Sequence, residues 1–179
     1  KGSVKNSSET PAALHVNQSL RAADVSTSYT STNKCNLVGN IDFFKRGAEE
    51  LAFDRALAAT GTVTVTEGRL VLTKDASWKG ASEIVVAPDA ETADGCGPVL
   101  EIASGRTFSG KATLSLGTGA TVAFHGTTPF VQSVKRMTVD GRDVEPSVYT
   151  KANAPAGVTF VGAAGAIRVR GGGLVLVVR

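Results

Sequence analysis

Short runs of alternating apolar and polar residues, separated by glycine, form the main pattern of the chain. Over 62–66 valine alternates with threonine, and after a Glu67-Gly68 break a second apolar run covers 69–72. Alternation with a period of two residues is typical of a half-buried β-strand, and glycine between two such runs favours a turn. The stretch therefore predicts two short strands joined by a tight connection.

The same pattern recurs downstream. Further predicted strands cover 83–87, 98–103, 111–116, 120–124 and 165–169. The unit 61–72 can be laid beside 110–124, and a weaker copy covers 157–169, with Gly68, Gly119 and Gly165 as the predicted corresponding glycines. Short strands at roughly ten-residue spacing indicate a sandwich, a barrel or a β-solenoid. Imperfect copies suit a solenoid, because each repeat has to match only its neighbours.

The C-terminal third predicts a hairpin. Residues 136–139 and 142–144 flank Asp140-Gly141, which is a strong two-residue turn signal. A last run, 174–178, is apolar on both faces and predicts a covered strand. The predicted fold class is all-β, a parallel β-helix (β-solenoid) with a C-terminal hairpin cap, and a β-sandwich is the alternative.

Residues 43–59 leave helix and strand open. Leu51, Ala52, Arg55, Ala56 and Ala59 lie at helical spacing. However, the apolar face is thin and rich in alanine. One short helical turn is therefore a possible element of this segment.

The domain organisation follows from the polarity of the N-terminal region. Residues 1–34 are rich in Ser, Thr and Asn and predict an arm or linker with one short strand near 13–17, whereas 35–179 predict a single β-rich domain. The chain has no 18-residue apolar run, so no membrane span is expected within it. Its first residues do not resemble a signal peptide, and we expect the chain to be part of a larger polypeptide.

Composition limits the core and the partners. Hydrophobic residues make up 42% of the 179 residues and aromatic residues only 6%, so small and β-branched side chains are expected to build the core. The net charge is +3, but the lysines and arginines are scattered along the chain. A nucleic-acid partner is therefore not expected, because such a surface gathers cations on one element.

Two cysteines, Cys35 and Cys96, have no further Cys or His at zinc-ligand spacing. Two interpretations remain open. A disulfide would tie the N-terminal segment to the core, worth about 3 to 4 kcal/mol in the chain-entropy model. The alternative is two independent thiols, and the secreted character of the chain favours the disulfide.

Part of the sequence resembles a known family of repeats. Residues 45–53, followed by 61–72, resemble the autotransporter-associated β-strand repeat, although Glu49 stands where that repeat usually has glycine. Residues 137–169 are similar to segments that follow such repeats in large secreted bacterial proteins. The resemblance implies a right-handed parallel β-helix passenger of an exported or cell-surface bacterial protein. The family supplies no catalytic residues to carry over.

Candidate chemistry is sparse, and no catalytic residues are predicted. Ser104 and Ser109 lie near glycines, but His125 belongs to another strand end and no third group is expected to orient it. Asp89, Glu91 and Asp94 share one loop and are a possible calcium site, the one cofactor considered. Their spacing lacks the usual calcium-loop ladder, and acidic turns are commonly just solvated.

Glycan binding requires exposed aromatic rings beside polar groups. Trp78, Tyr149 and Tyr29 lie in polar surroundings and are the candidates, although for Trp78 the favoured interpretation is the cap of a small core. The expected function is a non-enzymatic structural or adhesive module, secreted or on the bacterial cell surface, with a glycan or another surface component as a possible partner. The alternative is a carbohydrate-binding module appended to a secreted carbohydrate-active enzyme, and an enzyme in its own right ranks third.

Overall fold

The computed structural model describes residues 3–6, 12–17, 31–33, 36–89 and 97–171, and within these ranges the protein consists of β-strands and connections, with no helix. The largest sheet contains, in spatial order, β16 (Arg142–Asp143), β15 (Arg136–Val139), β12 (Thr113–Leu116), β10 (Glu83–Val86), β8 (Thr62–Val65), β5 (Ile41–Arg46) and β2 (Ala12–Asn17). The second sheet contains β18 (Thr159–Val161), β13 (Thr121–Phe124), β11 (Val99–Ile102), β9 (Arg69–Leu72), β6 (Glu50–Phe53) and β3 (Ser31–Asn33).

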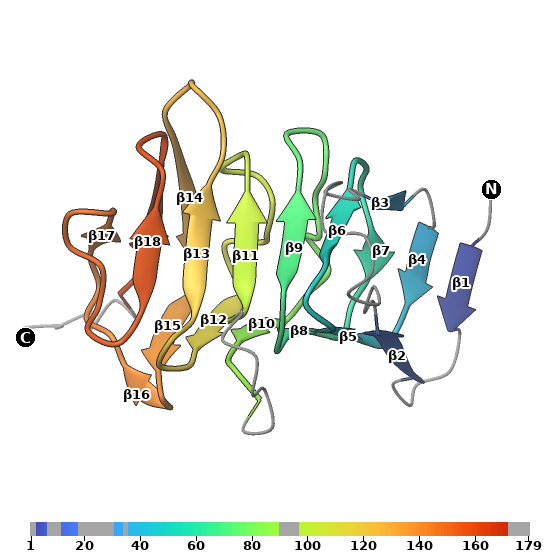
Figure 1. Ribbon diagram of the computed structural model, residues 1–179. Helices are drawn as coiled ribbons and strands as arrows, with labels where there is room; N and C mark the ends of the chain where they lie inside the picture. Colours follow the sequence, from blue (N-terminus) through green and yellow to red (C-terminus); the bar gives the residue numbers. More distant parts are fainter. Residues whose placement is uncertain (1–2, 7–11, 18–30, 34–35, 90–96, 172–179) are drawn as a thin grey trace, which may run out of the picture.

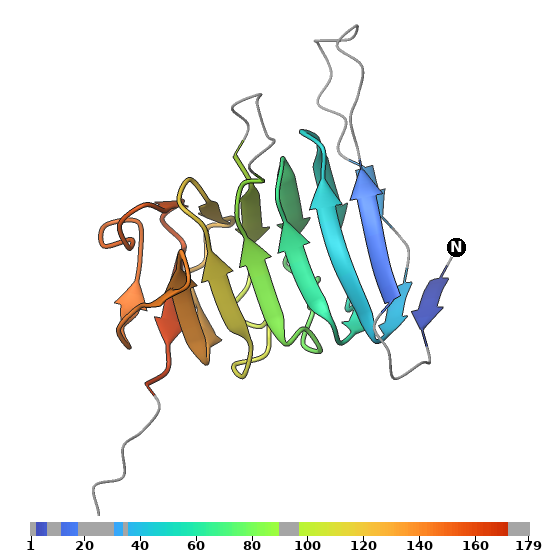
Figure 2. The same cartoon turned by 90° about the horizontal axis from the view of Figure 1, so that it is seen from below.

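Two smaller sheets complete the fold. One contains β1 (Ser3–Asn6), β4 (Asn36–Gly39) and β7 (Ala58–Ala59), and the other contains β14 (Phe130–Val134), β19 (Gly165–Val169) and β17 (Val148–Tyr149). Figures 1 and 2 show the strands side by side in rows, with β1 to β3 at one end of the molecule and β17 and β18 at the other. No described segment is a helix long and apolar enough to cross a lipid bilayer.

Parallel pairing dominates the described strands. Every strand pair is parallel except β15 with β16 and β17 with β19. From β8 to β13 the chain alternates between the two large sheets, so each strand pairs with the next but one along the sequence. Parallel neighbours need such long connections, and here a strand of the other sheet forms part of each connection.

The core follows from this register. Val63 of β8 lies opposite Ile84 of β10, which lies opposite Leu114 of β12, and all three side chains are buried. In the second sheet the corresponding row contains Leu70, Leu100 and Val122. Because side chains alternate between the two faces of a strand, the polar residues between these apolar ones point outward. All these apolar residues belong to one continuous core cluster.

The helical interpretation of residues 43–59 is wrong. This segment forms β5, β6 and β7, and in β5 buried and less buried side chains alternate. Phe43 packs against Phe53 with ring centroids 5.9 Å apart, so the aromatic residues fill the core from two different strands. Tertiary packing overrides the helix propensity of the alanines, as propensity is only a weak preference.

The predicted hairpin is confirmed, with Thr138 opposite Asp143 in antiparallel β15 and β16. Asp140 (φ 49°) and Gly141 (φ 75°) adopt the left-handed backbone that the two-residue turn requires. Asp140 also accepts hydrogen bonds from the Thr118 hydroxyl (2.6 Å) and backbone N–H (2.8 Å), which lower the pKa of its carboxyl group. The turn is thereby tied to the loop that follows β12.

The predicted equivalence of Gly165 with Gly119 is wrong. Gly165 begins β19 and lies opposite Phe130, in a different sheet from the strand that follows Gly119. The spatial neighbour of Gly119 is Gly157, whose carbonyl accepts a hydrogen bond of 2.7 Å from the Gly119 N–H. Both glycines have positive φ, 87° and 86°, at the corner that leads into β13 and β18.

The segment 1–34 contains three described strands. β1, β2 and β3 pair in parallel with β4, β5 and β6 respectively. The predicted final strand 174–178 lies outside the described residues.

A buried glutamine of β14 binds the backbone of Phe108, which lies in the connection between β11 and β12. Gln132 is 1% exposed; its Oε1 accepts a hydrogen bond from the Phe108 N–H (3.1 Å), and its Nε2 donates to the Phe108 carbonyl (3.2 Å). The side-chain amide therefore takes the place of a neighbouring strand. Buried backbone groups rarely lack a partner, which explains a polar side chain at this position.

Replacing Gln132 by Leu should lower the free energy of unfolding by about 3 kcal/mol, because two backbone groups of Phe108 lose their partner in a dry site. Chemical denaturation measures this change. Val131→Ala, at an exposed neighbouring position, is the matched control and should change the stability by less than about 0.5 kcal/mol. An unchanged stability of the Gln132→Leu variant would contradict the bridging role.

Lys45, the second-last residue of β5, is a fully buried cation. Its Nζ donates hydrogen bonds to the carbonyls of Arg46 (2.9 Å), Gly47 (2.5 Å) and Glu67 (3.2 Å). Burial lowers the pKa of Lys45 from 10.5 to about 8, partly offset by the carboxylates of Glu67 and Glu49. The ammonium group thus joins the corner after β5 to the corner before β9.

The lowered pKa predicts a pH dependence. Between pH 8 and 10.5 the unfolded chain binds the Lys45 proton more strongly than the folded chain, so the free energy of unfolding should rise with pH across this window, by about 2 to 3 kcal/mol. Denaturation at several pH values measures the slope. In Lys45→Met the rise should be absent, whereas the exposed control Lys111→Met should retain it; an equal slope in both variants would refute the assignment.

Candidate functional site

The outward face of the second sheet carries a charged cluster across three neighbouring strands. Glu101 of β11 lies opposite Val71 of β9 and opposite Ala123 of β13. Arg69 precedes Val71 by two residues and His125 follows Ala123 by two, so the period of the strands puts these side chains on the face of Glu101. The small neighbours leave room for the side chains of Arg69 and His125 to reach the carboxylate.

The carboxylate of Glu101 is held from both sides. Arg69 Nη1 donates to Glu101 Oε2 at 2.9 Å, and His125 Nδ1 lies 3.0 Å from Glu101 Oε1. The Glu101 side chain is 10% exposed, whereas those of Arg69 and His125 are 47% and 72% exposed. Because Nδ1 carries the proton in this contact, Nε2 of His125 remains available as a hydrogen-bond acceptor.

A hollow of about 680 Å³ lies over this cluster. The parallel strands β9, β11 and β13 end at the same edge of the sheet, where Figure 1 shows their following loops side by side. The lining residues come from the sheet face and from these loops: Glu50, Arg69, Val71, Thr73, Lys74, Glu101, Ala103, His125, Gly126, Thr127 and Thr128.

A second hollow, of about 480 Å³, adjoins the first. The two share Lys74, Ala103 and Thr128 in their walls. The second hollow adds two exposed cations, Lys79 and Arg106, from the loops after β9 and β11. We call the two joined hollows the loop-edge groove.

The orientation of His125 corrects one sequence-based interpretation. No residue was expected to orient this histidine, yet Glu101 does so from the neighbouring strand. Glu101 and His125 are 24 positions apart, and only the parallel register of β11 and β13 brings them together. Ser104 and Ser109 have turn roles instead, since their hydroxyls accept hydrogen bonds from the N–H groups of Arg106 and Lys111.

The interpretation of Trp78 as an exposed glycan platform is wrong. Its side chain is fully buried, and its ring lies 5.2 Å from Phe43 and 5.9 Å from Phe53, centroid to centroid. Its indole N–H donates to the Ala59 carbonyl at 3.1 Å. The alternative interpretation as a core residue describes Trp78 correctly, because the indole finds both apolar neighbours and a polar partner inside.

Tyr149 does not line the loop-edge groove. Tyr149 of β17 is half-buried against the core, and its hydroxyl donates to the Glu145 carbonyl at 2.8 Å. Tyr29 lies outside the described residues.

The calcium and disulfide candidates fall largely on residues that are not described. Asp89 is exposed after β10, whereas Glu91, Asp94, Cys35 and Cys96 lie outside the described residues. Within the described ranges, no group of three or more His, Cys, Asp or Glu side chains is placed to hold a metal ion.

Comparison of the chain with protein-family models, with curated proteins and with solved structures finds no match.

The Arg69–Glu101 pair predicts a measurable coupling. In a double-mutant cycle with Arg69→Leu and Glu101→Leu, we expect a coupling free energy of about 1 kcal/mol, because Glu101 is nearly buried while Arg69 is half exposed. Chemical denaturation of the four proteins gives the value. The matched cycle on the exposed Arg136–Asp143 pair should give a smaller coupling; equal couplings would show that burial of Glu101 does not matter.

Proposed function

We propose that this chain is a non-enzymatic structural or adhesive module of an exported or cell-surface bacterial protein, built as a parallel β-helix. The observation that carries the proposal is the stacking of short, parallel, in-register strands in two sheets that the chain visits alternately. Such a stack gives a long, rigid body with large side surfaces, which suits a stalk or an adhesive segment.

The parallel pairing favours the β-helix over the β-sandwich. Sandwiches are built from antiparallel strands joined by hairpins and Greek-key connections. Here the antiparallel pairs are β15–β16 and β17–β19, both near the C-terminal end of the row of strands, where they serve as the proposed cap. The resemblance of residues 45–72 to the autotransporter-associated β-strand repeat supports the same proposal.

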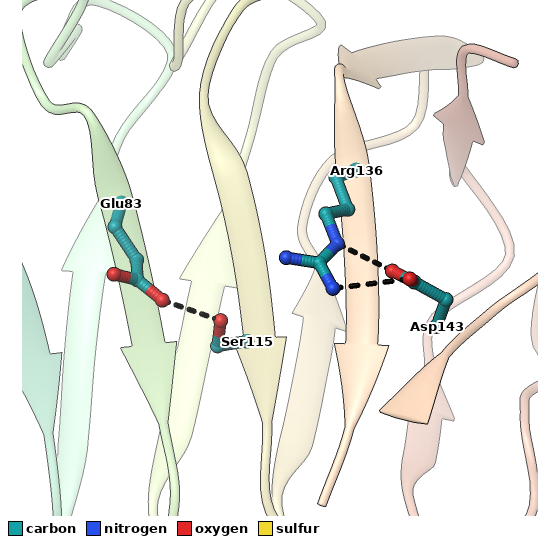
Figure 3. A network of polar contacts seen from close by, with 4 residues as sticks. All are labelled: Glu83, Ser115, Arg136 and Asp143. Atoms are coloured by element: carbon teal, nitrogen blue, oxygen red, sulfur yellow. Dashed lines mark hydrogen bonds and ion pairs between the residues drawn. The ribbon is translucent and has the colours of Figure 1, made fainter. Parts of the chain in front are cut away.

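The outward face of the largest sheet suits a surface exposed to water. Glu83 accepts a hydrogen bond of 2.6 Å from the Ser115 hydroxyl, and Arg136 forms a two-point ion pair with Asp143, as Figure 3 shows. This pairing raises the pKa of Arg136 and lowers the pKa of Asp143. The polar groups therefore satisfy one another across neighbouring strands and keep the face charged.

A second candidate function is a carbohydrate-binding module of a secreted enzyme. The observation that favours it is the loop-edge groove, whose hollows have volumes of about 680 Å³ and 480 Å³, within the usual range for a ligand site. The same groove would equally serve an adhesive module. The adhesive module and the carbohydrate-binding module would therefore use the same groove. They differ in the kind of protein to which this chain would belong.

The surface location can be tested on intact cells of the source organism. An antibody raised against this chain should label them without permeabilisation, and brief proteinase K treatment should remove the label while a cytoplasmic marker protein survives. Permeabilised cells give the total amount of the protein. Labelling that requires permeabilisation would overturn the proposed location.

A further inference from the structure

We propose that the loop-edge groove binds a polysaccharide that carries carboxylate groups. The inference rests on the adhesive role proposed above and names its ligand class. It starts from the shape of the surface: the two hollows meet at Lys74, Ala103 and Thr128, so one continuous depression runs from Arg69 to Arg106. An elongated groove along a sheet edge accommodates successive units of a chain better than a single small molecule does.

The cations of the groove are the first element of recognition. Lys79 and Arg106 are exposed in its walls, and their side chains form no hydrogen bond or ion pair with another described residue. Lys74 lies 3.9 Å from Asp75, at the limit of an ion pair, with both side chains mostly exposed. Three ammonium or guanidinium groups are thus ready to donate to a ligand carboxylate.

Acceptors between these cations are the second element. Glu50 and Asp75 line the groove together with the hydroxyls of Thr73, Thr127 and Thr128. Carboxylate oxygens accept hydrogen bonds from sugar hydroxyls, and threonine hydroxyls can donate or accept. Next to them, His125 presents Nε2 as a further acceptor, because Glu101 holds its Nδ1.

The mixture of charges distinguishes a carboxylated glycan from a nucleic acid. Each nucleotide of a nucleic-acid strand brings a negative phosphate and few hydroxyl donors, so the groove carboxylates would repel the strand without accepting hydrogen bonds from its sugars. Proteins that bind single strands also offer several aromatic platforms for the bases, whereas Phe130 is the one Phe, Tyr or Trp among the described residues that line the groove. Each unit of a carboxylated glycan brings several hydroxyl donors beside its one carboxylate, and this lining requires both.

Affinity gel electrophoresis with two forms of one polymer tests the inference. Polygalacturonate should retard the protein, and the fully methyl-esterified polymer, which has the same backbone without the charges, should not. Lys79→Gln/Arg106→Gln should weaken the binding of polygalacturonate by about tenfold, because two exposed cations are lost. The matched control Lys111→Gln/Lys135→Gln removes two cations that do not line the groove and should leave binding unchanged.

The outcomes separate the inference from the function on which it rests. Equal melting temperatures of the two double variants would show that folding is not the cause of the difference. No retardation by polygalacturonate, equal retardation by the esterified polymer, tighter binding of single-stranded poly(dT), or equal loss in both double variants would each overturn the inference. If intact cells are labelled and polygalacturonate does not bind, only the ligand class fails; if they are not labelled, the proposed location fails whatever the groove binds.

Discussion

The parallel register between neighbouring strands is the constraint from which both the core and the surface follow. In register, like residues stack on like: Val63, Ile84 and Leu114 form one inward row, and Leu70, Leu100 and Val122 form another. The side chains between them are thereby turned outward, where the same register brings Arg69, Glu101 and His125 together. The alternating pattern that buries the apolar side chains therefore also places a charged cluster on the outward face of the second sheet.

Two polar side chains in the interior have backbone groups as their hydrogen-bond partners. Gln132 replaces the missing backbone partners of Phe108, and Lys45 satisfies three carbonyls at a corner where the chain leaves β5. Each is costly to bury and each is hydrogen-bonded, which is the condition for keeping it there. These two residues are therefore part of the architecture as much as the apolar rows are.

The sequence predicts the strands after residue 61 well, because alternation and glycine turns are local signals that parallel packing does not disturb. It leaves residues 43–59 open between helix and strand, since the alanines there fit a helix until Phe43 and Phe53 meet in the core. Strand β14 is not predicted at all, and its buried Gln132 interrupts the apolar pattern. The burial of Trp78 and the Glu101–His125 contact depend on which strands are neighbours. Local sequence patterns predict strands but do not specify which strands pair. The groove is not predicted from the sequence for the same reason, because its walls come from three separate loops.

The row of strands has a consequence for the cooperativity of unfolding. Among the described strands, β10 pairs with β8 and β12 alone, so its stability depends on two neighbours rather than on every strand of the row. A destabilising change at one end of the row of strands affects the other end only through the strands between them. The loss of structure should therefore proceed inward from the ends, where the edge strands have one partner, and the central strands should be the last to exchange their amide protons with solvent.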